Sequence, residues 1–184
     1  MGDQHGGPTA MANVLSDSLI ECDGLDTNDL AARYLKWWQS GGFDTGPVFH
    51  DVMTQLENGL SLPEAAIKVD VGHDGLTAGC NPAHRIAPLS LVSSISIMQL
   101  PELAIKEAQI THLHPLAGDV SAAVAVLLRA LLEGNNFEKS KALAADGRLP
   151  ETEQALLNAD ANPQSNSGFS PHVLRAAIHF IDHN

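Results

Sequence analysis

The chain has 184 residues, which suits one domain that can bury a core of its own. Apolar residues make up 44% of the sequence but aromatic residues only 4%, so the core has to be built from aliphatic side chains, and packed helices are favoured over a β-sandwich. The formal charge of -12 and the scattered placement of Lys and Arg argue against a nucleic-acid partner, because phosphate binding needs clustered basic side chains.

The first part of the chain has the periodicity of helices separated by glycine-rich turns. Thr27 is a suitable N-cap for the second of these helices, and Gly41 is a suitable stop for it. Pro47 fits the first turn of the third helix, and Gly59 closes it. The pattern predicts helices over residues 9–21, 28–40, 47–58 and 62–70.

The second part of the chain is also predicted to be helical. The segment 81–91 is too rich in proline for a helix interior, and residues 87–100 favour a helix, although their Ile and Ser content leaves a strand open. No segment alternates between polar and apolar residues for long enough to predict a strand. Further helices are expected over residues 101–110, 115–134, 136–147 and 167–183. We therefore expect one all-α domain, a compact helical bundle that spans residues 1–184.

Neither a membrane nor an oxidising compartment is indicated. The longest apolar run, residues 122–128, is far shorter than the roughly 20 residues that a membrane span needs. The first residues have neither the basic nor the apolar part of a signal peptide. Cys22 and Cys80 are too few for a disulfide framework. These features predict a cytoplasmic protein with reduced thiols.

A glycine-rich loop precedes the first helix and carries polar residues. Asp3 and Thr9 lie on either side of this loop, where backbone amides could bind an anion and the two side chains could offer oxygen ligands to Mg²⁺. The alternative is an ordinary helix cap made by Thr9. Asp44 and Thr45 stand before the third helix, where each could act as a cap or contact a ligand.

Two histidines, His112 and His114, precede the most apolar helix. With Asp119 they could form part of a zinc site, but His114 directly before a proline is also a suitable helix cap, and the latter interpretation is favoured. Cys80 has no poised base beside it, so a catalytic thiolate is disfavoured. Trp38 falls on the core side of its helix, which favours packing over stacking with a ligand.

The order of these motifs resembles the ADP-ribosylglycohydrolase family, including its crystallin J1-like branch. The motifs that carry the resemblance are "GGFDTGP", "GCNPAHRIAPLSL" and "THLHPLAGDVSAAVAVLLRALL". The resemblance implies an all-α fold and hydrolysis of the glycosidic bond of ADP-ribosylated substrates with two Mg²⁺ ions. It also implies that the turn at Cys80 borders the ADP-ribose site and that a histidine of the second motif lies across from it. The implied substrate-binding residues are Asp44, Gly46, Gly79, Cys80, Asn81, His112 and His114.

The sequence departs from the family at its metal-binding segments. Family members carry Thr-Asp-Asp-Thr where this chain has residues 6–9, so only Thr9 matches and two carboxylates are missing. Asp3 matches an early family aspartate and is the candidate catalytic residue, and Asp3 and Thr9 are the candidate metal ligands. The late Gly-Gly-Asp-x-Asp-Thr segment is not found.

The resemblance therefore leads us to expect a truncated chain whose last helix has an uncovered apolar face, which a second copy of the chain could cover. The residues expected on that face are Val173, Ala176, Ala177 and Phe180.

Three functions remain open at this point. The first is a Mg-dependent hydrolase of ADP-ribosylated substrates with reduced or lost activity. The second is a non-catalytic ADP-ribose binder or crystallin-like structural protein of the same fold. The third is a helical interaction domain without a small-molecule site.

Overall fold

A computed structural model describes residues 6–158 and 167–183. The described residues form α-helices and one 3-10 helix, and their sheet-like pairing is limited to an isolated antiparallel bridge between Gly79 and Phe169. The all-α expectation is therefore confirmed. The elements are α1 (Gly7–Glu21), α2 (Thr27–Gln39), α3 (Pro47–Glu57), α4 (Leu62–Gly72), α5 (Asn81–Arg85), η1 (Ala87–Leu91), α6 (Leu100–Ala108), α7 (Pro115–Leu132), α8 (Phe137–Ala145), α9 (Pro150–Leu157) and α10 (Ser170–Asp182).

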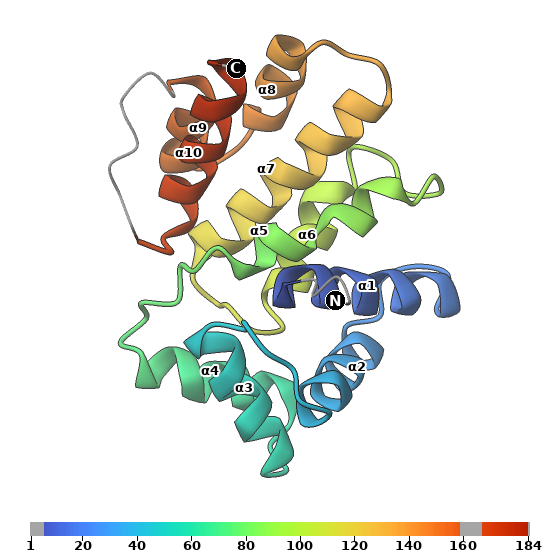
Figure 1. The fold of residues 1–184 in the computed structure, drawn as a ribbon, viewed down its shortest axis with the longest axis vertical. Coiled ribbons are helices and arrows are strands. Elements are labelled where there is room, and N and C mark those ends of the chain that lie inside the picture. The colour runs from blue at the N-terminus through green and yellow to red at the C-terminus, as the bar shows by residue number, and fades with distance from the viewer. Residues whose placement is uncertain (1–5, 159–166, 184) are drawn as a thin grey trace, which may run out of the picture.

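Helix α7 is the centre of the fold. It packs against α5, α6 and η1 on one side and against α8, α9 and α10 on the other. Helices α2, α3 and α4 form a separate group at the other end of the molecule, and α1 lies between this group and the middle of the fold (Figure 1). The long connection from α4 to α5 and the connection from α6 to α7 join the two ends, and both contribute to the cleft described below.

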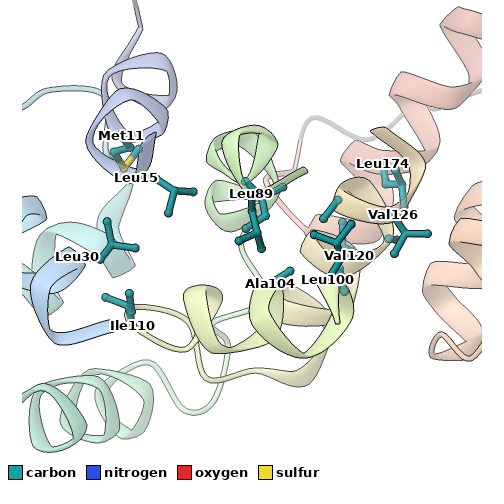
Figure 2. Close-up of a cluster of buried hydrophobic side chains, with 14 of the residues drawn as sticks. Met11, Leu15, Leu30, Leu89, Leu100, Ala104, Ile110, Val120, Val126 and Leu174 are labelled. Atoms are coloured by element: carbon teal, nitrogen blue, oxygen red, sulfur yellow. The ribbon is translucent and has the colours of Figure 1, made fainter. Parts of the chain in front are cut away.

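The core is aliphatic, as the composition predicts. Figure 2 shows Leu89, Leu100 and Val120 directed towards one another where η1, α6 and α7 meet, and each is at most 1% exposed. Small residues on α7 allow this close approach. A side chain at Gly118 would begin 3.4 Å from the Cα atom of Ile105 on α6, so the glycine lets the two helices pack tightly.

Helix α7 has the length and mean hydropathy of a membrane span, with a mean hydropathy of 1.7 over 18 residues. However, 72% of that window is buried by the other helices, which is the position of a core helix in a bundle.

Contacts between neighbouring residues explain where the helices begin, and one predicted N-cap is corrected. Asp26, and not Thr27, caps α2, because its carboxylate accepts from the backbone N–H groups of Asn28 and Asp29 at 2.9 and 3.0 Å. Thr27 is the first helical residue. At α4, Ser61 and Glu64 form a capping box, which explains why this short helix begins where it does.

The expected helix over residues 87–100 is wrong. Only the 3-10 helix η1 forms there, followed by turns, and the short helix α5 precedes it. The physical reason is Arg129 of α7, whose guanidinium donates to the carbonyl oxygens of Ser90, Val92 and Ile95, each at 2.7 Å. These carbonyls are satisfied by a distant side chain, so the segment needs no helix of its own.

Helix α9 was absent from the sequence prediction. Pro150 at its start and Glu151 and Glu153 in its first turn are the signals that could have found it.

The last helix buries one side and leaves another uncovered. Leu174 and Ile178 are buried, whereas Phe180 is 61% exposed and Ala177 is also exposed. Val173 and Ala176, expected on the same uncovered face, are half-buried. Pairing of this face with a second copy stays a prediction.

Candidate functional site

A cleft with a volume of about 500 Å³ lies between the start of α3, the connection before α5, the turn before α7 and the start of α10. Most of its wall is apolar, and three histidines are among its lining residues. Its described lining residues are Gly46, Pro47, Val48, His73, Leu76, Ala78, Gly79, Cys80, Asn81, His112, His114, Gly168 and Phe169. Six of the seven residues expected to bind substrate are therefore brought together, and Asp44 is the exception. Whether they bind a ligand stays a prediction.

Ser170 fixes the segment before α5 against the start of α10. Its hydroxyl, which is fully buried, lies 3.0 Å from the carbonyl oxygen of Ala78 and 2.7 Å from that of Gly79. The bridge between Gly79 and Phe169 runs beside these contacts. Residues some 90 positions apart thus form one rigid wall of the cleft.

Gly79 and His112 are in direct contact. A Cβ atom at residue 79 would lie 3.0 Å from Nε2 of His112, which is closer than ordinary side-chain packing allows. The expectation that a histidine lies across the cavity from this turn is therefore wrong for His112, which belongs to the same wall. The turn before α7 and the segment before α5 meet at this contact.

Asn81 ties the start of α5 to the start of α3. Its side-chain amide donates to the carbonyl oxygen of Thr45. The next residue, Gly46, has a φ of 71°, and a Cβ there would come within 3.0 Å of the Asn81 amide nitrogen. Glycine is thus required at 46 both by its left-handed backbone and by the approach of Asn81.

His114 is the N-cap of α7, as its place before proline indicated. Its Nδ1 accepts from the backbone N–H of Leu116 at 3.2 Å, so in the neutral ring the proton is on Nε2. Its own backbone N–H donates to the hydroxyl of Thr77 at 3.2 Å, and Thr77 in turn donates to Asp70. The Leu116 contact therefore fixes the ring, and the Thr77 contact fixes the backbone that carries it at the cleft wall.

His73 and Phe169 line the cleft but were not singled out from the sequence. His73 follows the end of α4, and its Nε2 lies 2.8 Å from a carboxylate oxygen of Asp51 on α3. Phe169 precedes α10 and is half-buried. The histidine in "VGHDGL" was a usable signal to the extent that the Asp and Gly after it mark the end of a helix. No local sequence feature marked Phe169 as a residue of the cleft.

The remaining predicted residues lie elsewhere. Thr9 is exposed in the first turn of α1 and is not part of the cleft wall. Asp44 is exposed, has a φ of 54°, and places one carboxylate oxygen about as close to Gly6 as ordinary packing allows. Asp3 lies outside the described residues. The structure thus leaves the catalytic role of Asp3 and the metal role of Asp3 and Thr9 as predictions.

The described residues do not fit the paired Mg²⁺ ions that the resemblance implies. No group of three or more His, Cys, Asp or Glu side chains close enough to hold a metal occurs between residues 6 and 158 or 167 and 183. At Gly7, where the family pattern has an aspartate, a Cβ would lie 2.1 Å from the carbonyl oxygen of Phe43 and 2.6 Å from that of Asp44. The space for a carboxylate side chain is occupied by backbone. Mg²⁺ depends on carboxylates, so this part of the chain cannot hold it tightly.

The weaker alternatives are also disfavoured. Asp119, once a possible zinc ligand with the two histidines, accepts from the backbone N–H of Leu149 at 2.9 Å and lies 3.3 Å from a guanidinium nitrogen of Arg148. Burial raises the pKa of the Cys80 thiol, which opposes a thiolate. Both Trp37 and Trp38 are partly buried and pack against the core, and neither lines the cleft.

Comparisons with known proteins agree with this fold. The sequence matches the family model described as ADP-ribosylglycohydrolase over residues 6–184. A solved structure described as "ADP-ribosylglycohydrolase-related protein complex" superposes with a TM-score of 0.79 at 25% identity, over 98% of this chain and 60% of that chain. An uncharacterized protein of Archaeoglobus fulgidus is 27% identical over 121 residues, or 64% of this chain and 37% of that protein. The chain therefore spans less than two thirds of the length of each.

Proposed function

The chain belongs to the ADP-ribosylglycohydrolase family, and we propose that its cleft binds the ADP-ribosyl group of a substrate whose glycosidic bond is hydrolysed. The observation that carries this proposal is the meeting of the segment 79–81 with His112 and His114 in one cavity of about 500 Å³. A volume of this size lies within the range of small-molecule sites. The crystallin J1-like branch has no support beyond the motifs themselves.

The chemistry of the wall suits an ADP-ribosyl group. Phe169, Leu76 and Val48 offer apolar and aromatic surface for a planar base. The neutral ring of His114 offers an N–H donor at Nε2, which suits the oxygen atoms of a ribose or a diphosphate. Contacts within the protein already fix the His114 ring, so the ring needs little further ordering when a ligand binds.

Hydrolysis also needs a group that moves protons at the glycosidic bond. The described lining residues include no carboxylate, but His73 is paired with Asp51 at 2.8 Å. A carboxylate beside an imidazole orients the ring. We therefore assign proton transfer to His73, oriented by Asp51.

The alternative function is binding of ADP-ribose without hydrolysis. The two functions share the cleft and differ only in turnover. They are separated by measuring binding and product release on the same protein.

The test combines calorimetry with a hydrolysis assay. ADP-ribose is titrated into the protein with Mg²⁺ or with EDTA, and ADP-ribose released from ADP-ribosylated peptides is measured by chromatography. We expect binding that survives EDTA, and release that falls in His73→Gln. Loss of binding in Phe169→Ala, with binding retained in Ile67→Ala outside the cleft, would support the location. Absence of ADP-ribose binding by the folded protein would overturn both functions, and binding without release would favour the second.

A further inference from the structure

A continuous chain of buried polar side chains runs from the core to the cleft. Glu107 accepts from the hydroxyl of Tyr34 at 2.9 Å and from Nε of Arg85 at 2.6 Å. Arg85 then donates from Nη2 to the hydroxyl oxygen of Thr111 at 3.0 Å. That oxygen lies 2.8 Å from Nδ1 of His112. None of these five side chains belongs to a residue more than 2% exposed.

The direction of the hydrogen bonds along this chain is decided by Arg85. A guanidinium can only donate, so the Thr111 oxygen accepts from it and keeps one proton to give. Among the described residues the acceptor in reach of that proton is Nδ1 of His112. If Nδ1 carried a proton instead, the hydroxyl proton of Thr111 would be buried without an acceptor, which is unfavourable. In the neutral ring, His112 therefore carries its proton on Nε2.

The ring is neutral over the physiological range. Burial, followed by the positive charge of Arg85 and the neighbouring His73, lowers the pKa of His112 from 6.5 to about 3. The ring therefore keeps one nitrogen as donor and one as acceptor, and the bond to Thr111 decides which is which.

The donor nitrogen is at the cleft wall. Nε2 of His112 is the atom that a Cβ at residue 79 would approach, and His112 lines the cavity together with Gly79. No hydrogen bond joins this nitrogen to another side chain or backbone group within residues 6–158 and 167–183. Its N–H is thus available to an acceptor atom that enters the cleft.

We propose that Arg85, acting through Thr111, is a positioning residue that holds His112 with its proton on Nε2, so that the cleft presents a fixed N–H donor to an oxygen atom of the ligand. Together with the Nε2–H of His114, this makes two neutral donors on rigid supports. Only the identity of the ligand rests on the proposed function. The state of the ring is a property of the protein alone.

The first test needs no ligand. Nitrogen-15 NMR of the His112 ring in the full chain distinguishes a protonated Nε2 from a protonated Nδ1. We expect the unmodified protein and Thr111→Ser, which keeps the hydroxyl, to have Nε2 protonated and Nδ1 hydrogen bonded. In Thr111→Val, which keeps the shape but removes the hydroxyl, the Nδ1 signal should shift and a population with Nδ1 protonated should emerge. A protonated Nδ1 in the unmodified protein, or identical spectra for Val and Ser, overturns the proposal.

The second test measures what the donor does for binding. ADP-ribose affinity should fall about fivefold to tenfold in Thr111→Val and stay within about twofold in Thr111→Ser, as expected for one hydrogen bond. Equal affinity of the Val and Ser variants would contradict the positioning role. If no variant binds ADP-ribose, the proposed function fails while the NMR result still decides the state of the ring.

Discussion

Gly79 and His112, 33 positions apart, meet so closely that a single added Cβ atom would lie 3.0 Å from the imidazole Nε2. The glycine belongs to the segment that leads into α5, and the histidine belongs to the turn between α6 and α7. Their contact is the point at which two motifs that are separate in the sequence become one cleft wall. Because Gly79 has no side chain, Nε2 of His112 has room at the cleft wall.

The first prediction concerns this contact. We expect Gly79→Ala to push the His112 ring aside and to weaken ADP-ribose binding about tenfold, since a displaced donor loses most of one hydrogen bond. Calorimetry provides the measurement. Gly72→Ala is the matched control, because a Cβ there has no neighbour within 4 Å and the residue is outside the cleft. Equal effects of the two changes would argue against the contact.

The second prediction concerns the start of α1. Gly7→Ala should lower the free energy of unfolding by about 2–3 kcal/mol, because the new Cβ would collide with the backbone of residues 43 and 44. At Gly6 the nearest atom is 3.5 Å away, so Gly6→Ala should change stability by no more than about 0.5 kcal/mol. Urea unfolding of both variants tests this. A Gly7→Ala protein as stable as the original would mean that the loop at Phe43 does not close over α1.

The third prediction concerns pH. His112 has a pKa of about 3 in the folded chain against 6.5 when unfolded, so between these values only the unfolded chain binds the proton. Its contribution to stability is therefore complete above pH 6.5 and is lost as the pH falls towards 3, with a slope of up to about 1.4 kcal/mol per pH unit.

His112→Gln isolates this contribution, because the other titrating groups are shared by both proteins. The difference in unfolding free energy between the original protein and the variant should shrink as the pH is lowered from 6.5 to 4. A difference that stays constant over this range would show that the buried ring is protonated in the folded state.

The fourth prediction concerns the buried ion pair of Arg85 and Glu107, both fully buried, with Nε and Oε1 2.6 Å apart. Removing one partner leaves the other charge buried, so Arg85→Met should cost about 3–5 kcal/mol. Adding Glu107→Leu should recover part of this loss, and a double-mutant cycle in urea measures the coupling. If the effects of the two changes on the unfolding free energy simply add, the two side chains are not coupled as an ion pair.

An exposed pair provides the control for that cycle. Lys106 and Glu102 are one turn apart on α6 and lie 2.7 Å apart, but their side chains are 53% and 73% exposed. Lys106→Met should therefore change stability by less than about 0.5 kcal/mol, because solvent screens the charges.

Most helices could be predicted from the sequence because their causes are local. Apolar spacing places α1 and α7, and the proline in the first turn of each helix marks its start. The capping role of His114 was also within reach, since an N-cap acts on a backbone group two residues away. The family resemblance depended on short motifs of the same local kind, and the family match over residues 6–184 confirms it.

What the tertiary structure alone decided depends on residues far apart in the chain. Arg129 turned an expected helix into η1 and a series of turns by satisfying carbonyls some 35 positions away. The carbonyl of Phe43 closed the place of a carboxylate at Gly7, and Arg85 set the direction of the hydrogen bond to His112. Periodicity and capping report on neighbours within a turn or two of helix, whereas the space beside a glycine and the proton on an imidazole depend on which distant atom packs against it.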